Sequence, residues 1–148
     1  MIAARPSIAP AWSPNGGSIA VVVIGARGNA GLADMDVVDV ATGSEKMMPL
    51  PTADVRGTDW LEDTSLIVST AIKESEPVQL LRLSYPDGLL ARLSNDVDFY
   101  DGISLTRDRT TLAAARSNGR YGIWVGDGLG RQGRHAYRGE LGRRRLDR

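Results

Sequence analysis

Four parts of the sequence contain residue types that carry chemistry in proteins: a glycine-rich segment, an acidic segment, a single histidine and an arginine-rich C-terminal segment. The glycine-rich segment, Gly25-Ala-Arg-Gly28-Asn-Ala-Gly31, follows a short apolar run. Glycines at this spacing hold a dinucleotide pyrophosphate only where a helix follows, because the helix N-terminus attracts the phosphates. Residues 32–40 have a β-like pattern instead. The sequence therefore favours a hairpin or interstrand loop over a nucleotide site.

The acidic segment runs Asn95-Asp-Val-Asp-Phe-Tyr-Asp-Gly102 and could bind calcium, because clustered carboxylates are calcium ligands. An EF-hand loop needs an oxygen ligand at its fifth position and glycine at its sixth. Counted from Asp96, these positions hold Tyr100 and Asp101. The pattern fails, so we predict a solvated turn between structural units, with calcium binding as the alternative.

Catalytic residues are not apparent in the sequence. The chain has no cysteine and one histidine, His135, which excludes thiol catalysis, disulfides and a multi-histidine metal site. The G-x-S-x-G motif of serine hydrolases and the H-R-D and D-F-G motifs of protein kinases do not occur. We therefore expect this chain by itself to be no enzyme, with no catalytic residue, cofactor or metal.

Charge is distributed unevenly along the 148 residues, although 18 basic and 18 acidic side chains cancel in total. Residues 131–148 contain seven arginines and two acidic residues, whereas residues 1–130 carry an excess of acidic side chains. With little apolar periodicity, the segment 131–148 is predicted to be a basic, flexible tail. Such a tail could contact phosphates, but the balanced total charge leads us to expect no nucleic-acid partner.

The elements that must position these residues are strands. Short β-branched or alternating segments are separated by turn signals such as Pro14-Asn-Gly-Gly17 and Pro86-Asp-Gly88. No segment carries a helical apolar stripe, so the pattern predicts an all-β protein. The longest apolar run, residues 19–24, is too short for a membrane span. The first residues lack a signal-peptide pattern, and the compartment is left open between bacterial cytoplasm and the outer part of a larger protein.

An internal repeat organises these strands. A large apolar residue, a polar turn and an apolar strand recur from Trp12, Trp60 and Leu105, which are 48 and 45 residues apart. A second recurring feature is a strand and a tight turn ending in Gly43 or Gly88. A period of this length with four short strands fits one β-propeller blade. We expect Trp12 and Trp60 to be buried between blades, and assign structural roles to the repeat anchors Trp12, Pro14, Asn15, Gly16, Trp60, Asp63, Leu105, Asp108 and Trp124.

The residues Pro10-Ala-Trp-Ser-Pro-Asn-Gly16 with Ile19-Ala20 resemble the repeat of TolB-like, WD40-like (PD40) β-propellers. The segment 79–112 is similar to propellers of bacterial receptor-type serine/threonine kinases. That similarity lies in a Tyr-Pro-x-Gly turn, a Leu-x-Asn-Asp segment and a Gly-x-Ser-Leu strand, here Tyr85-Pro-Asp-Gly88, Leu93-Ser-Asn-Asp96 and Tyr100-Asp-Gly-Ile-Ser-Leu105.

The resemblance implies a partial β-propeller of about three four-stranded antiparallel blades, at residues 1–50, 51–97 and 98–130, with an irregular tail at 131–148. It implies a non-catalytic module that binds a protein, peptide or small ligand within a larger sensor protein such as a bacterial kinase. The alternative is a fragment of the substrate-gating propeller of a prolyl-oligopeptidase-like peptidase, and a third is a propeller following a winged helix in a transcriptional regulator. Since closed propellers have about four to eight blades, open blade edges predict possible self-association.

Overall fold

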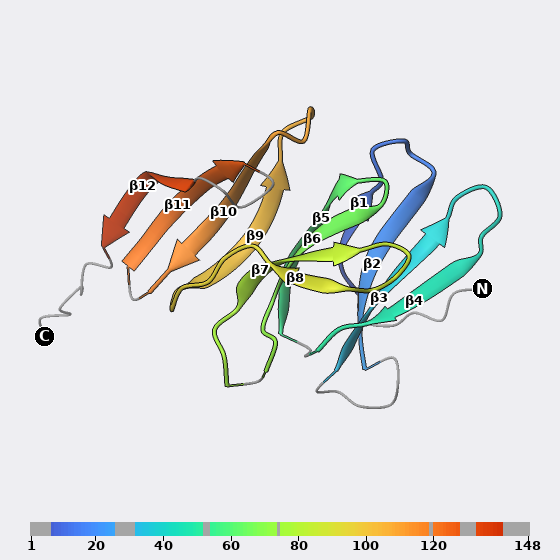
Figure 1. Ribbon diagram of the computed structural model, residues 1–148, viewed down its shortest axis with the longest axis horizontal. Coiled ribbons are helices and arrows are strands. Elements are labelled where there is room, and N and C mark those ends of the chain that lie inside the picture. The colour runs from blue at the N-terminus through green and yellow to red at the C-terminus, as the bar shows by residue number, and fades with distance from the viewer. Residues whose placement is uncertain are drawn as a thin grey trace, which may run out of the picture.

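The computed structural model describes residues 7–25, 32–51, 54–73, 75–118, 120–127 and 133–140. Over these residues the chain forms twelve strands in three four-stranded sheets that stand side by side (Figure 1). Within the same ranges, no helix is long and apolar enough to span a membrane. The predicted all-β class is confirmed, and the sheets form an open array rather than a closed ring.

Each sheet is built from four consecutive antiparallel strands and is called a blade below. Blade 1 comprises β1 (Ser7–Trp12), β2 (Ser18–Ile24), β3 (Ala33–Asp39) and β4 (Glu45–Pro49). Blade 2 comprises β5 (Val55–Glu62), β6 (Ser65–Thr70), β7 (Gln79–Ser84) and β8 (Leu90–Arg92). Blade 3 comprises β9 (Phe99–Leu105), β10 (Thr111–Ser117), β11 (Arg120–Asp127) and β12 (Gly133–Glu140). The predicted three-blade architecture is confirmed.

The end of blade 3 differs from the predicted boundary at residue 130. Strand β12 pairs with β11 as the fourth strand, and His135 stands opposite Trp124 in that ladder. Residues 133–140 therefore belong to the repeat and not to an irregular tail. The charged sequence is compatible with this placement because backbone hydrogen bonds hold the strand, and outer strands of sheets commonly carry charged side chains. Residues 141–148 lie outside the described ranges.

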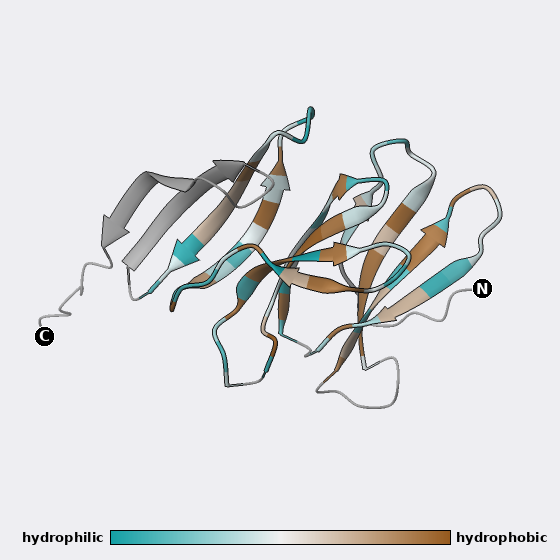
Figure 2. Ribbon diagram, viewed as in Figure 1, coloured by the Kyte–Doolittle hydropathy of each residue, from teal (hydrophilic) through white to brown (hydrophobic). Residues whose placement is uncertain are grey.

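The core lies between the blades, and blade 2 is buried on both faces. Leu66 and Val68 of β6 belong to the apolar cluster shared with blade 1, whereas Ile67 belongs to the cluster shared with blade 3. All six residues of β6 are buried. Successive side chains of a strand point to opposite faces, so a strand between two neighbours is apolar at consecutive positions. Figure 2 shows these apolar residues concentrated on the strands of blades 1 and 2.

The two tryptophans of the repeat have different surroundings. Trp60 is fully buried, donates a hydrogen bond from Nε1 to the carbonyl oxygen of Ala11 at 3.0 Å, and packs edge-on against Tyr85 at 5.6 Å. Trp12 is 56% exposed. The prediction of burial is thus correct for Trp60 and wrong for Trp12. The difference arises because Trp12 lies on the face of β1 that points away from blade 2, where the described chain places no further blade.

The innermost strands β1, β5 and β9 contact one another in sequence, and each contains a break in its pairing register. At the break in β5, a Cβ atom on Gly57 would lie 3.0 Å from the backbone nitrogen of Ile103 and 3.2 Å from the carbonyl carbon of Gly102. The backbones of blades 2 and 3 therefore approach each other at a distance that only glycine permits.

Replacing Gly57 with alanine should destabilise the protein by about 1–3 kcal/mol, because the added methyl group overpacks against backbone atoms that cannot turn aside. Urea unfolding monitored by circular dichroism measures this loss. Ala91→Ser, which adds one heavy atom at an exposed position of β8, should leave the midpoint nearly unchanged. Equal midpoints for Gly57→Ala and the native chain would contradict the close approach of β5 and β9.

Candidate functional site

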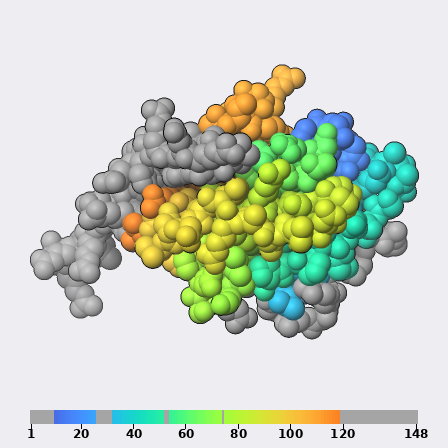
Figure 3. Space-filling model, viewed as in Figure 1, coloured from blue at the N-terminus to red at the C-terminus, as the bar shows by residue number. Residues whose placement is uncertain are grey.

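The turns that join the first two strands of each blade carry most of the repeat anchors and lie along one rim of the molecule (Figure 3). The β1–β2 turn contains Pro14, Asn15 and Gly16, the β5–β6 turn contains Asp63, and the β9–β10 turn contains Asp108. The strand anchors Trp12, Trp60 and Leu105 lie in β1, β5 and β9. Trp124 lies in β11, and its side chain is outside the described part of the structure.

Asn15 and Asp108 perform the same structural task in their turns. The side-chain oxygen of Asn15 accepts hydrogen bonds from the Ser13 hydroxyl at 2.9 Å and the Gly17 N–H at 2.7 Å. Asp108 accepts the equivalent bonds from Thr106 and Thr110. The bond from the Thr106 hydroxyl and those from Thr110 lower the pKa of Asp108. These anchors therefore act within their own turns, and no ligand is required to explain them.

Arg109 links blade 3 to blade 2. It is not among the residues predicted from the sequence. It occupies the position of Gly16, and both have left-handed backbone, with φ of 59° and 72°. A non-glycine residue rarely adopts this conformation without compensating contacts. The Arg109 guanidinium donates to Asp59 Oδ1 at 2.8 Å and to the Trp60 carbonyl oxygen at 2.9 Å. Alignment of the β1–β2 and β9–β10 turns would have singled out Arg109, because it places this arginine where the first turn has Gly16.

A charged cluster lies where the innermost strands of blades 2 and 3 meet; Asp54, Arg56 and Asp101 form this inner cluster. Arg56 donates from Nε to Asp54 Oδ1 at 2.8 Å and from Nη1 to Asp101 Oδ1 at 3.1 Å. Hydrogen bonds from Asp54 and then Asp101 raise the pKa of Arg56. The three side chains are between 41% and 47% exposed. They are thus paired with one another and still open to solvent.

Asp101 belongs to the acidic segment of the sequence, whereas no local pattern in the sequence marks Arg56. The two residues are 45 positions apart and meet only because β5 and β9 lie side by side. Arg56 also lies at the register break of β5, between Val55 and Gly57. Its backbone therefore departs from the regular ladder at the same place where its side chain is exposed.

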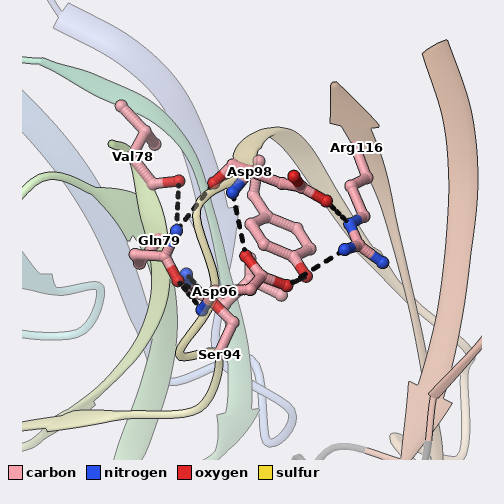
Figure 4. A network of polar contacts seen from close by, with 8 residues as sticks. Val78, Gln79, Ser94, Asp96, Asp98 and Arg116 are labelled. Carbon is pink, nitrogen blue, oxygen red and sulfur yellow. Dashed lines mark hydrogen bonds and ion pairs between the residues drawn. The ribbon is translucent and has the colours of Figure 1, made fainter. Parts of the chain in front are cut away.

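The acidic segment enters a polar network between blades 2 and 3 (Figure 4). Gln79, at the start of β7, donates to the carbonyl oxygen of Asp98 at 2.7 Å and accepts a bond from the Ser94 hydroxyl at 2.7 Å. The Asp98 N–H donates to Asp96 Oδ1 at 3.1 Å. Because Gln79 is itself buried, its amide fixes the course of the loop that leads from β8 to β9.

One cation pairs with both carboxylates of this network. Arg116 of β10 pairs through Nε with Asp98, which is 2% exposed, and through Nη2 with Asp96 at 3.4 Å. The Tyr100 hydroxyl donates to Asp96 Oδ2 at 2.8 Å, and burial followed by this hydrogen bond raises the pKa of Tyr100. We call these residues, Gln79, Ser94, Asp96, Asp98, Tyr100 and Arg116, the interblade lock.

The lock corrects the interpretation of the acidic segment as solvated. The segment does lie between blades, and Val97 is 82% exposed, but Asp98 is buried against Arg116. The pairing could not be seen in the sequence because Arg116 is brought opposite Tyr100 by the β9–β10 register. Among the residues that the structure describes, no group of three or more acidic, histidine or cysteine side chains is arranged to hold a metal ion.

The glycine-rich segment connects two antiparallel strands, β2 and β3, with Gly25 N–H bonded to the Leu32 carbonyl oxygen at 2.9 Å. A strand therefore follows the glycines, where a dinucleotide site requires a helix. The predicted interstrand connection is confirmed, while residues 26–31 lie outside the described ranges.

Comparison with known proteins extends the fold assignment. No protein-family model matches the sequence, and no curated protein matches it. A solved structure described as TolB from Agrobacterium tumefaciens superposes with a TM-score of 0.76 and 13% identity over 93% of this chain and 53% of that chain. For TolB from Acinetobacter baumannii the TM-score is 0.70, with 19% identity over 88% of this chain and 32% of that chain.

A puromycin-hydrolysing peptidase of Mycobacterium tuberculosis is also similar, with a TM-score of 0.67 and 17% identity over 86% of this chain and 22% of that chain. The present chain therefore spans about half or less of the length of these solved proteins. At such low identity the likeness shows the fold alone: the three sheets are β-propeller blades, arranged as in the TolB structures.

Replacing Arg116 with methionine should destabilise the protein by about 3–5 kcal/mol, because it leaves the buried Asp98 carboxylate without its cation. The double variant Asp98→Asn/Arg116→Met should recover part of that loss. Arg92→Met removes an exposed ion pair with Glu76 and should cost at most about 1 kcal/mol. Denaturant unfolding of these variants and of Asp98→Asn alone measures the losses, and additive losses in the double variant would show that the two lock residues are not coupled.

The raised pKa of Tyr100 makes stability depend on alkaline pH. Above about pH 10 an unfolded tyrosine ionises while Tyr100 in the folded protein keeps its proton, so the free energy of unfolding should fall by about 1.4 kcal/mol per pH unit. In Tyr100→Phe this component of the slope should be absent. Absorbance at 295 nm should show the same number of ionised tyrosines in both folded proteins at pH 11. One additional ionised tyrosine in the native chain would contradict the burial of Tyr100.

Proposed function

We propose that this chain is a non-catalytic interaction module that binds a peptide segment of another protein at the inner cluster. The observation that carries this proposal is the half-exposed set of Arg56 and Asp101 on the innermost strands and Asp54 directly before β5. Innermost strands of a propeller surround its axis, and propellers bind ligands with residues at the mouth of that channel. A peptide would therefore meet these charges first.

The chemistry of the cluster suits a peptide that carries charges of both signs. The Arg56 guanidinium has five N–H donors in a planar fork, and its bonds to Asp54 and Asp101 leave donors available to a ligand carboxylate. The two aspartates can accept a ligand lysine or arginine in exchange for part of their contact with Arg56. Because Arg56 already pairs with both aspartates, the surface is stable without a ligand, and the one negative charge in excess attracts a basic group of the peptide.

The larger protein around this module is proposed to be a sensor or signalling protein. The resemblance of residues 79–112 to propellers of bacterial serine/threonine kinases supports this context. A second candidate is the propeller of a prolyl-oligopeptidase-like serine peptidase, which the structural likeness to a puromycin-hydrolysing peptidase favours. A kinase domain or an α/β-hydrolase domain encoded in the same reading frame distinguishes the two.

Peptides selected from a random display library on the purified chain should lose at least about tenfold in affinity when Arg56 is replaced with alanine, since charge-assisted hydrogen bonds contribute about 1.5–3 kcal/mol. Isothermal titration calorimetry measures the loss. Arg92→Ala is the matched control, because Arg92 is a similarly exposed, ion-paired arginine on the outer strand β8. Equal affinity of both variants for the selected peptides would contradict binding at the inner cluster.

A further inference from the structure

Blade 1 exposes an apolar face that corresponds to a buried face of blade 2. Trp12 and Met47 are 56% and 48% exposed, and Ile19, Val21 and Val38 on the same face are partly exposed, with Asp36 as an acidic residue among them. The β1–β2 and β5–β6 ladders place Trp12 opposite Ile19 and Trp60 opposite Leu66. Trp60 and Leu66 are completely buried against blade 1. The face of blade 1 is thus built like an interblade contact surface but lacks a neighbour in the described chain.

The contact between blades 1 and 2 joins one large side chain to small ones. The large Trp60 packs in the cluster that contains the small residues Ala11 and Ala20 of blade 1, and its indole N–H bonds to the Ala11 carbonyl oxygen. At the contact between blades 2 and 3, the residue at the Trp60 position is the smaller Leu105. The residue at the Ala11 position is Asp59, whose carboxylate accepts a hydrogen bond from the Leu105 N–H at 3.2 Å. The tryptophan therefore packs against alanines, and the leucine packs beside a larger side chain.

Blade 3 presents small residues on its open face. The β9–β10 ladder places Leu105 opposite Leu112, as β1–β2 places Trp12 opposite Ile19, so Ser104 and Ala113 take the positions of Ala11 and Ala20. Ser104 is exposed and Ala113 is partly exposed. Because Leu105 and Leu112 pack toward blade 2, the alternation of a strand directs Ser104 and Ala113 to the opposite face. The residues of this surface are therefore as small as those against which a tryptophan packs at the contact between blades 1 and 2.

Charge also favours contact between blade 1 and blade 3. Residues 7–49 contain four acidic and two basic side chains, whereas residues 99–140 contain four acidic and seven basic ones. The first and last blades of one chain therefore carry opposite net charges. Two copies would attract each other blade 1 to blade 3 and would repel each other in a blade 1 to blade 1 arrangement.

We propose that two copies of this chain associate head to tail and close one six-bladed ring. Trp12 of each copy packs on Ser104 and Ala113 of the other, and its indole N–H donates to the Ser104 carbonyl oxygen, as Trp60 donates to Ala11. Two identical contacts related by twofold symmetry cover both open faces and leave none for further association. The ring size lies within the four to eight blades of closed propellers. The chain also covers 53% of the TolB-described structure from Agrobacterium tumefaciens.

Sedimentation equilibrium of the full chain tests this association, which does not depend on the proposed peptide binding. The native chain should sediment at twice its 15.9 kDa mass. Trp12→Arg and Ala113→Arg should each raise the dissociation constant at least about 100-fold, because each change disrupts two hot-spot contacts per ring. Leu89→Arg, at a 68% exposed position of the β7–β8 turn, should leave the dimer intact. Circular dichroism checks that every variant is folded.

Mixing the two disrupted variants provides the orientation test. A pair formed by one Trp12→Arg chain and one Ala113→Arg chain retains one native contact, so the mixture should form more dimer than either variant alone. A native chain that stays monomeric at 100 μM, on the order of the weakest specific associations, overturns the proposal. A polydisperse series of larger species, or a dimer that both arginine variants leave unchanged, overturns it as well.

Discussion

The structure depends on the packing of each blade against the next at the end of its innermost strand. Trp60 fills the space beside Ala11 and Ala20 and satisfies its only polar atom on the Ala11 carbonyl oxygen. Leu105, Asp59 and Arg109 form the corresponding contact one blade later. A four-stranded sheet that is apolar on both faces cannot be stable alone in water, because both apolar faces would be exposed. Blade 2, which has neighbours on both faces in the described part of the chain, therefore depends on them for its stability.

The polar groups around this apolar contact between blades are of two kinds. The interblade lock places Asp98 at 2% exposure and satisfies it with Arg116, so it fixes the relative positions of blades 2 and 3. The inner cluster carries similar charges at the innermost strands but leaves them half exposed. Burial therefore separates a structural ion pair from the proposed recognition surface, although aspartate and arginine form both. The same comparison assigns the turn anchors Asn15 and Asp108 to structure, since their oxygens are occupied by bonds within the turn.

The repeat made the blades predictable from the sequence. The spacing of Trp12, Trp60 and Leu105 located the turn between the first and second strands of each blade, and Gly43 and Gly88, which have positive φ, marked the turns between third and fourth strands. Pairings across blades were not predictable, because the partners of Arg56, Arg109 and Arg116 are set by strand register and not by local pattern. The exposure of Trp12 was misjudged for a similar reason: its burial depends on a blade that precedes it in a ring. Strand β12 was overlooked because its arginines suggested a tail, while backbone pairing alone places it in the sheet.

In the proposed dimer, the face of blade 1 that carries Trp12 is covered by the face of blade 3 that carries Ser104 and Ala113 in a second copy. Tryptophan fluorescence reports on this directly, since indole emission shifts to shorter wavelength when the ring leaves water. Emission of the native chain should shift to shorter wavelength as the protein concentration rises through the dissociation constant, and Trp12→Phe should abolish the shift. An emission maximum that does not depend on concentration, or a shift that persists in Trp12→Phe, would contradict the claim.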